Sequence, residues 1–173
     1  VELRARVQGF LQERNFEAGA KVEKGQKLFL VEPEPYEAEL AQRKAQLASA
    51  RATEQNASAQ LERYKTLESK EVASTAQLDV RIADEARAKA SVLEAEAAVK
   101  DAEIKLSYTT ISAPISGRIG RWSVDPGNLV GPDSGVLAVI VNTEKMYILF
   151  PVTQAQLLAA RRNTDAQDFT VQV

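Results

Sequence analysis

The chain has 173 residues, with 22 Lys and Arg against 24 Asp and Glu, and it contains no Cys and no His. This balanced charge, without a block of one sign, disfavours a nucleic-acid surface. The missing side chains exclude thiol chemistry, disulfides, and histidine as a metal ligand or general base. No apolar run approaches the roughly 18 residues that a membrane-spanning helix needs.

The first 34 residues alternate apolar and polar positions around glycines, a pattern typical of short, half-buried strands. Turns are predicted at Gly19 and Gly25, because glycine adopts a positive φ without strain. Pro33 and Pro35 should end the last strand, and Pro35 suits the first turn of a following helix. The side chains predicted to face inward are Val7, Leu11, Phe16, Val22, Leu28, Leu30 and Val31.

Residues 35–107 favour two long helices, 36–68 and about 75–106, joined by a short turn near 69–74. The first would be a rod of roughly 50 Å, at about 1.5 Å per residue. Apolar residues spaced by three, four and seven predict a coiled-coil seam that Glu54 and Lys89 interrupt. The seam is predicted at Tyr36, Leu40, Leu47, Ala50, Ala57, Leu61 and Tyr64 of the first helix, and at Leu78, Ile82, Ala86, Leu93, Ala97 and Ile104 of the second.

Acidic and basic residues four apart on these helices should form ion pairs that add a few tenths of a kcal/mol each. The predicted pairs are Glu39 with Arg43, Glu85 with Lys89, Glu96 with Lys100, and Asp101 with Lys105.

Residues 108–142 return to a period of two and repeat the first 34 residues at an offset of 108. Neither copy can enclose a core by itself, so we expect the two to pair into one β-sandwich with the helices leaving between them. The matching positions are Val7 with Ile115, Gly9 with Gly117, Leu11 with Ile119, Gly19 with Gly127 and Val22 with Val130, and, after a slip of one, Leu28 with Leu137, Leu30 with Val139 and Val31 with Ile140. Asp125-Pro126-Gly127 is predicted to be a turn, and Trp122 to be a packing residue.

Residues 143–173 are predicted to open another β domain, with a strand at 146–152, a short helix at 154–162 and a last strand from Phe169. Because strand-like sequence stands at both ends, we expect the chain to be a segment of a longer protein.

Residues 106–120, LSYTTISAPISGRIG, together with Glu17-Ala18-Gly19, Val22 and Lys24-Gly25-Gln26, resemble the membrane fusion proteins, or periplasmic adaptors, of Gram-negative tripartite efflux pumps of the AcrA and MexA type. The resemblance implies an α+β fold. It would comprise a split lipoyl-like β-sandwich (1–34 and 108–142), an inserted antiparallel coiled-coil α-hairpin (35–107) and part of a β-barrel domain (143–173).

The hairpin turn carries a further similarity. Arg63, Leu67 four residues on, and Ser74 seven beyond that match the spacing of the family's channel-docking motif. The resemblance implies that these residues dock on an outer-membrane channel. Each of these three residues also has a possible structural role in place of docking. Ser74 begins an S-x-x-Q capping box, Leu67 could be the last seam residue, and Arg63 could be a solvated helix charge.

The resemblance implies a periplasmic adaptor that links an inner-membrane RND transporter to a TolC-like outer-membrane channel for drug efflux. It would act without catalysis or cofactor, be anchored to the inner membrane in the full-length protein, and self-associate into a ring, a hexamer by family resemblance. An adaptor of an ABC exporter or a type I secretion system has the same architecture. An adaptor that hands over metal would lack soft ligands, because the chain has one Met and no His or Cys. A lipoate or biotin carrier needs a modified Lys at a tight hairpin between the halves, where the helical insertion stands instead. A plain coiled-coil scaffold would not explain the repeat on either side.

Overall fold

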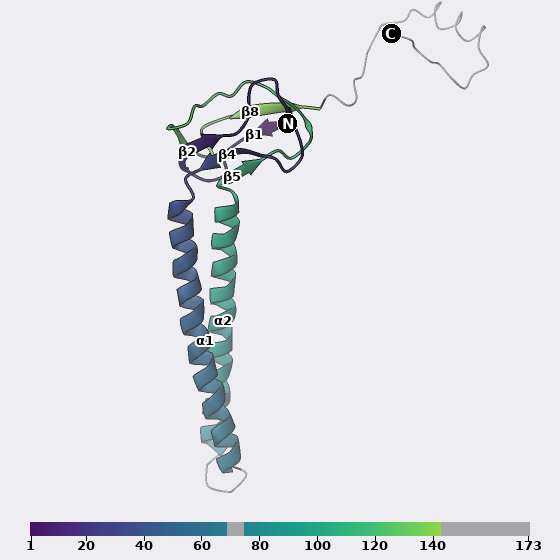
Figure 1. The fold of residues 1–173 in the computed structure, drawn as a ribbon. Coiled ribbons are helices and arrows are strands. Elements are labelled where there is room, and N and C mark those ends of the chain that lie inside the picture. The colour runs from purple at the N-terminus through teal and green to yellow at the C-terminus, as the bar shows by residue number, and fades with distance from the viewer. Residues whose placement is uncertain (69–74, 143–173) are drawn as a thin grey trace, which may run out of the picture. The chain divides into compact units, whose positions relative to one another are not determined.

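In the computed structural model, residues 1–68 and 75–142 are described, and residues 1–142 form one compact unit. This unit consists of a β module and a two-helix hairpin that extends from it (Figure 1). The fold class predicted from the sequence is confirmed for this unit. The predicted β-barrel part, 143–173, lies outside the described residues.

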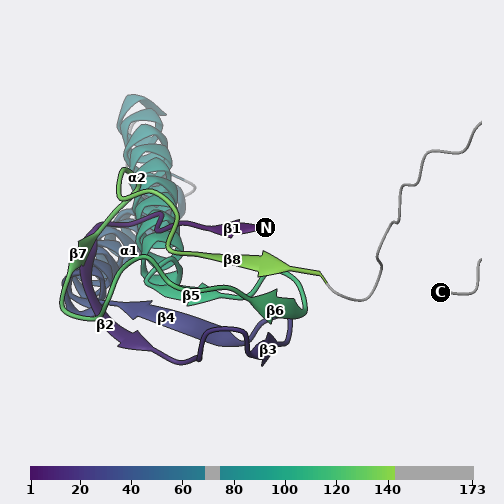
Figure 2. The same ribbon diagram turned by 90° about the horizontal axis from the view of Figure 1, so that it is seen from above.

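The β module contains two four-stranded sheets in which every strand pair is antiparallel (Figure 2). Each sheet takes strands from both sides of the helical insertion, as the sequence repeat requires. One sheet has the order β1 (Glu2–Leu3), β8 (Ala138–Val141), β6 (Gly117–Ile119), β3 (Lys21–Val22). The other has the order β5 (Thr110–Ser112), β4 (Lys27–Val31), β2 (Gly9–Arg14), β7 (Leu129–Val130).

The internal repeat is confirmed by equivalent contacts in the two sheets. Gly9 pairs with Val130, and its counterpart Gly117 pairs with Val22. The amide of Gly19 donates to the carbonyl of Ile119 at 2.8 Å, and the amide of Gly127 donates to the carbonyl of Leu11 at 2.7 Å. Gly19 and Gly127 both have positive φ, 80° and 93°, so both turns place a glycine in the left-handed region. The halves therefore exchange strands around a pseudo-twofold axis.

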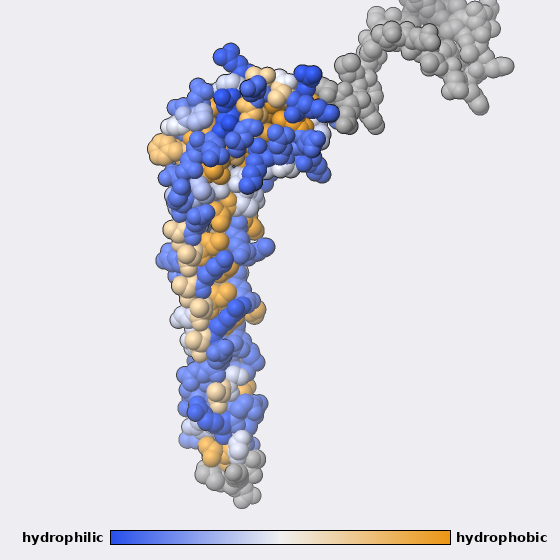
Figure 3. All heavy atoms as spheres, in the orientation of Figure 1, coloured by the Kyte–Doolittle hydropathy of each residue, from blue (hydrophilic) through white to orange (hydrophobic). Residues whose placement is uncertain are grey.

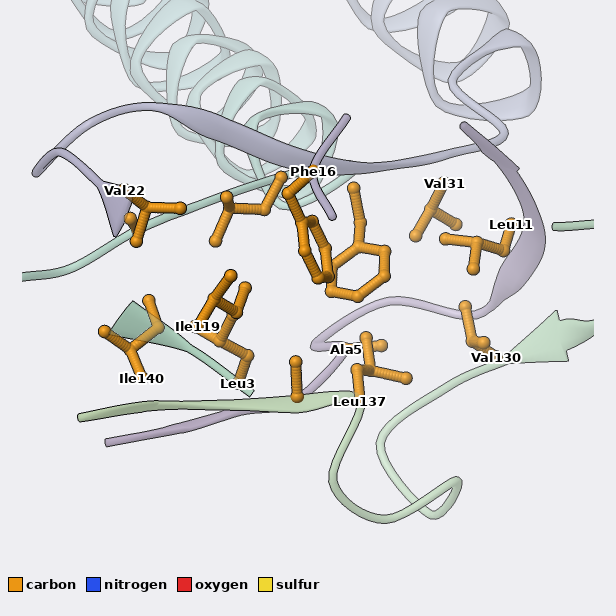
Figure 4. Packing of buried hydrophobic residues seen from close by; sticks show 14 residues of the cluster. Leu3, Ala5, Leu11, Phe16, Val22, Val31, Ile119, Val130, Leu137 and Ile140 are labelled. Carbon is orange, nitrogen blue, oxygen red and sulfur yellow. The ribbon is translucent and has the colours of Figure 1, made fainter. Parts of the chain in front are cut away.

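The core lies between the two sheets, where side chains from both halves meet (Figure 4). Phe16 stacks edge-on against Phe29, at 5.0 Å between ring centroids, and against half-buried Trp122 at 6.2 Å, which confirms Trp122 as a packing residue. The fully enclosed aliphatic residues include Leu11, Val22, Leu28, Val31, Ile119, Val130, Leu137 and Ile140.

One inward position in β4 is wrong. Phe29 is 1% exposed, whereas Leu30, which the alternation predicts to be inside, is only half-buried. The pairing of β4 with β5 shifts register between Lys27 and Phe29. The pairing of β4 with β2 shifts between Leu11 and Glu13, which lie opposite Val31 and Leu30. A bulge breaks the period of two, so consecutive residues can point to the same face.

The hairpin consists of α1 (Glu34–Glu68) and α2 (Thr75–Ser107), within one or two residues of the predicted ends. Its base is tied to the β module on both sides. The Tyr36 hydroxyl donates to the carbonyl of Gln8 at 2.6 Å, next to the start of α1. After α2, the Arg6 guanidinium lies 5.0 Å from the centre of the Tyr108 ring. Both connections thus fix the helices to the same end of the module.

The seam predicted for α1 is confirmed, because all seven of its residues are buried or half-buried, as is Glu54. The seam predicted for α2 is wrong beyond Leu78. Ile82 is 46% exposed, Leu93 67% and Ile104 39%, and Ala86 and Ala97 are exposed as well. Lys89 is also exposed and does not interrupt the seam. The residues of α2 that face α1 are Leu78, Arg81, Glu85, Ala88, Val92, Ala95, Val99, Ala102 and Leu106.

The difference follows from the two periods that α2 contains. Its real seam alternates steps of three and four from Leu78 to Leu106 and so keeps facing a partner along the whole hairpin. The α1 seam follows the same steps once half-buried Arg43 and Glu54 are counted. Ile82, Leu93 and Ile104 recur every 11 residues, a period that drifts away from a 3.5-residue seam. The prediction favoured these large side chains over Arg81 and Glu85, which are polar but stand at the correct positions. Figure 3 shows apolar residues exposed along the length of the hairpin.

Candidate docking site at the end of the hairpin

The candidate site is the end of the hairpin that lies furthest from the β module (Figure 1). The 35 residues of α1 make a rod of roughly 50 Å. Glu68 ends α1 and Thr75 begins α2, so the chain reverses between them. Among the described residues, a macromolecule that contacts the far end of the hairpin meets the last turns of α1 and the first turns of α2.

Two of the three predicted docking residues lie together on the last turns of α1. Arg63 is exposed, and its guanidinium has no hydrogen bond or ion pair with any part of the chain that the structure describes. Leu67 is 41% exposed, and four residues after Arg63 it lies on the same face of the helix. The alternative role of Leu67 in the seam is not supported, since half-buried Glu68 holds the next seam position after Tyr64.

The third predicted residue, Ser74, lies outside the described residues, and so does the capping box that it would begin. The helix that the box would start does begin at Thr75. The structure therefore brings Arg63 and Leu67 onto one exposed face and leaves the prediction for Ser74 untested.

The seam behind this face is polar. Arg81 of α2 stacks on the Tyr64 ring of α1, with 5.0 Å from its guanidinium carbon to the ring centre. One of its Nη atoms donates to the Gln60 side chain and to the Asp84 carboxylate, each at 3.3 Å. Its Nε is buried without a hydrogen-bond partner among the described residues. The sequence reasoning missed Arg81, although its place three residues after Leu78 and four before Glu85 fits the spacing of a seam and was a usable signal.

Glu85 forms the second polar contact of the seam. Its carboxylate accepts from the Ser58 hydroxyl of α1 at 3.2 Å and pairs with the Lys89 ammonium at 2.8 Å. The hydrogen bond from Lys89 lowers the pKa of Glu85 in spite of partial desolvation, and the same contact raises the pKa of Lys89. Nearer the base, Asp101 and then Glu39 raise the pKa of Lys105.

Three of the four predicted i,i+4 ion pairs are present: Glu39 with Arg43, Glu85 with Lys89, and Asp101 with Lys105. The fourth is wrong. Glu96 pairs with Arg51 of the other helix at 2.8 Å instead of with Lys100. The contact between helices could not be read from spacing within one helix.

A groove of about 420 Å³ runs between the helices beside this polar seam. Its walls carry hydrogen-bonding groups of both charges, including Asn56, Gln60, Arg81, Asp84 and Arg87. In the described part of the chain, no group of three or more Asp or Glu side chains could hold a metal ion. None of the described helices is long and apolar enough to cross a membrane. The arrangement offers hydrogen bonds and one apolar side chain to a macromolecule.

In this chain, a helical hairpin is inserted between the two halves of a β-sandwich and is attached to it at one end. This is the architecture of a barrel-sandwich hybrid domain with an inserted hairpin. The family model described as "RND MFP, barrel-sandwich hybrid domain" matches residues 1–142. The chain therefore belongs to the RND membrane fusion protein family, and the resemblance seen in the sequence is confirmed.

Individual relatives agree with this assignment. The chain is 41% identical to "Efflux pump periplasmic linker BepF" of Brucella suis, over 99% of this chain and 43% of the relative. It is 36% identical to "Multidrug resistance protein MdtA" of Proteus mirabilis, over 94% of this chain and 41% of the relative. A solved chimeric protein of MacA and MexA, which contains the Pseudomonas aeruginosa MexA α-hairpin domain, has a TM-score of 0.58 and 31% identity over 81% of this chain and 46% of that one. The chain spans less than half the length of these relatives.

Proposed function

We propose that this chain is part of a periplasmic adaptor that links an inner-membrane RND transporter to a TolC-like outer-membrane channel for drug efflux. The hairpin carries the contact with the channel through Arg63, Leu67 and Ser74 at its far end. The adaptor is anchored to the inner membrane and acts as a ring of copies, a hexamer by family resemblance. The chain catalyses no reaction and takes no cofactor.

The observation that carries this proposal is the exposed pair Arg63 and Leu67 on an arm held at its base. Tyr36, near the start of α1, and Tyr108, directly after α2, each contact the β module, through Gln8 and Arg6. An arm fixed in this way holds its far end at a set distance from the module, as a spacer between two membranes needs. A guanidinium without a partner in the described chain is suited to donate to backbone carbonyls or carboxylates of a channel, because its planar fork presents several N–H groups.

The family match favours an RND transporter over an ABC exporter or a type I secretion system. A role in which the adaptor itself transfers metal ions finds little support, since the sequence offers one Met and no His or Cys as soft ligands. A carrier of lipoate or biotin is disfavoured because α1 and α2 occupy the place of the tight turn that would present the modified Lys.

The test is Arg63→Asp in cells that depend on the protein for drug efflux, with drug susceptibility as the readout. Charge reversal should abolish docking and make the cells as susceptible as cells without the protein. Folding should be preserved, since exposed substitutions change stability by under about 0.5 kcal/mol. Arg121→Asp is the matched control, because Arg121 is also exposed and without a partner in the described chain, but lies in the β module.

Two results would remove the case for a contact at the end of the hairpin: efflux that survives Arg63→Asp, or an equal loss with Arg121→Asp. Ser74→Ala is a poorer probe, because the loss of a helix N-cap costs about 1 kcal/mol by itself.

A further inference from the structure

The seam of the hairpin changes character towards its far end. Leu61 is 5% exposed, and it is the one residue of α1 that is buried. Beyond it, the seam residues of α1 are Tyr64 and Glu68, both half-buried, and Leu78 of α2 is half-buried as well. In the described chain, no enclosed aliphatic side chain therefore fixes the last two turns of α1 against the first turns of α2.

Arg81 occupies this weakly packed part of the seam and contacts α1 at two levels. Its guanidinium carbon lies 5.0 Å from the centre of the Tyr64 ring. One Nη atom donates at 3.3 Å to the side-chain oxygen of Gln60, one helical turn before Tyr64. The same atom donates at 3.3 Å to the carboxylate of Asp84, on its own helix. A ring face and two acceptors thus hold one planar group in a single orientation.

Asp84 is itself held by a second arginine. Its Oδ1 accepts from Arg87 at 3.1 Å, whereas its Oδ2 accepts from Arg81. The Arg87 side chain is 77% exposed, and it makes no hydrogen bond or ion pair with the described residues of α1. If Arg81 is replaced, the carboxylate keeps a cationic partner, so no charge is left unpaired at the seam.

Arginine is an unfavourable residue at this position for stability. The Nε atom of Arg81 is buried and has no hydrogen-bond partner among the described residues. A buried donor without a partner destabilises a fold, and an apolar side chain of similar size would avoid that loss. A polar residue at a seam position can nevertheless specify how two helices align, at a cost in stability. The contacts that Arg81 makes with α1 are suited to such alignment.

The parts that this contact aligns are the two sides of the proposed docking site. Successive residues of an α-helix lie about 100° apart around its axis, so a Tyr64 ring in the seam places Arg63 on a different face. Leu67, four residues after Arg63, follows on that face. Arg81 itself lies six residues after Thr75, the first residue of α2. One contact therefore relates the exposed face of α1 to the start of α2.

We propose that Arg81 is a positioning residue for the far end of the hairpin. By stacking on Tyr64 and bonding to Gln60, it fixes the rotation and the axial level of the last turns of α1 relative to α2. Arg63 and Leu67 are thereby presented in one orientation. Arg81 acts through Tyr64 and not by contact with the channel. This role rests on the proposed function, in which the end of the hairpin binds the channel.

The variant Arg81→Leu separates positioning from stability. Leucine extends the apolar part of the seam and removes the unsatisfied Nε, so the melting temperature of the helices should stay the same or rise. Efflux should nevertheless fall, with a several-fold increase in drug susceptibility in cells that depend on the protein. A residue with a merely structural role would lose efflux only as far as the melting temperature falls.

Tyr64 supplies the conservative variant. Tyr64→Phe keeps the ring on which Arg81 stacks and should leave efflux unchanged. Tyr64→Leu removes the ring and should reproduce the defect of Arg81→Leu. The double variant Arg81→Leu/Tyr64→Leu should be no worse than either single variant, because the effects of residues that act as one unit do not add.

Arg87→Leu is the matched control. It removes the same charge and also takes a cation from the Asp84 carboxylate, but Arg87 has no hydrogen bond or ion pair with the described part of α1. Efflux should be unchanged in this variant.

The alignment of the hairpin end can be measured without the channel. Because this chain contains no Cys, nitroxide labels attach only to introduced thiols, and Lys65→Cys/Asp79→Cys places one exposed label near the end of each helix. The distribution of distances between the labels, from pulsed electron paramagnetic resonance, should be narrow in the parent and should broaden or shift with Arg81→Leu. A second pair in the middle of the hairpin, Gln46→Cys/Lys100→Cys, should give the same distribution in both backgrounds.

Four results would overturn the proposal. They are efflux that survives Arg81→Leu, a loss of efflux that follows a fall in melting temperature, an equal loss with Arg87→Leu, and label distances that do not change with Arg81→Leu.

Failure of this proposal is distinguishable from failure of the proposed function. Efflux that is sensitive to Arg63→Asp but not to Arg81→Leu removes the positioning role and leaves the docking site standing. Efflux that is insensitive to Arg63→Asp removes the channel contact, and the label distances then still report whether Arg81 aligns the hairpin end.

Discussion

In the β module the buried side chains are large and fully enclosed, whereas the hairpin buries mostly small or polar ones. Leu11, Leu28 and Leu137 are each 0% exposed in the module. In the hairpin only Leu61, Ala88 and Ala102 are buried among the described residues, and the seam includes Arg81 and Glu85. The module is therefore held by a core of its own. The hairpin relies on small side chains and on polar contacts across the seam, such as those of Arg81 with Tyr64 and Glu85 with Ser58. It also exposes large apolar side chains, including Ile82 and Leu93.

The largest effect is expected where the module tolerates no added atom. A Cβ on Gly117 would lie 2.3 Å from the carbonyl oxygen of Val141, in the adjacent strand. Gly117→Ala should therefore force β6 and β8 apart and reduce the free energy of unfolding by about 3 kcal/mol or more. Chemical denaturation, followed by the fluorescence of Trp122, measures it.

Gly120→Ala is the matched control, because its nearest neighbour would be the Val139 carbonyl oxygen at 3.4 Å, an ordinary contact. It should cost under about 1 kcal/mol. Equal losses in both variants would show that the close approach at Gly117 does not limit stability.

A medium effect is expected from enlarging the hairpin seam. Ala102 is 1% exposed, whereas Ala97, which the sequence placed in the seam, is exposed. Ala102→Leu should overpack the helices and cost about 1–3 kcal/mol. Ala97→Leu should cost under about 0.5 kcal/mol. Denaturation followed by the circular dichroism of the helices measures the stability of both variants. A larger loss for Ala97→Leu than for Ala102→Leu would support the seam first predicted for α2.

The smallest effect is the pH dependence of the Glu85 contact. Because the folded pKa of Glu85 lies below its ordinary value, its contribution to stability is present above about pH 4.3 and is lost as the pH falls through the lowered pKa. The melting temperature of the parent should exceed that of Glu85→Gln slightly at neutral pH, and the two should converge in acid. A difference that stays constant across this range would show that the charge of Glu85 contributes nothing.

Local patterns in the sequence were sufficient for the element types and for the repeat. The absence of Gly and Pro between 36 and 68 and the helix-forming composition located α1, and Gly19 and Gly127 marked equivalent turns. Motif spacing also led to Arg63 and Leu67, which the structure places on one exposed face. These features depend on neighbours within a few residues, so the sequence contains the information directly.

Only the tertiary structure decided which face of α2 is buried, which partner Glu96 takes and which residue of β4 points inward. α2 carries apolar or small side chains on two faces with similar periods, so composition alone cannot select between them. Contacts with α1 select the buried face, because Arg81 stacks on Tyr64 and Glu85 accepts a hydrogen bond from Ser58. The bulges that turn Phe29 inward, and the cross-helix contact of Arg51 with Glu96, likewise require a second element brought into place by the fold.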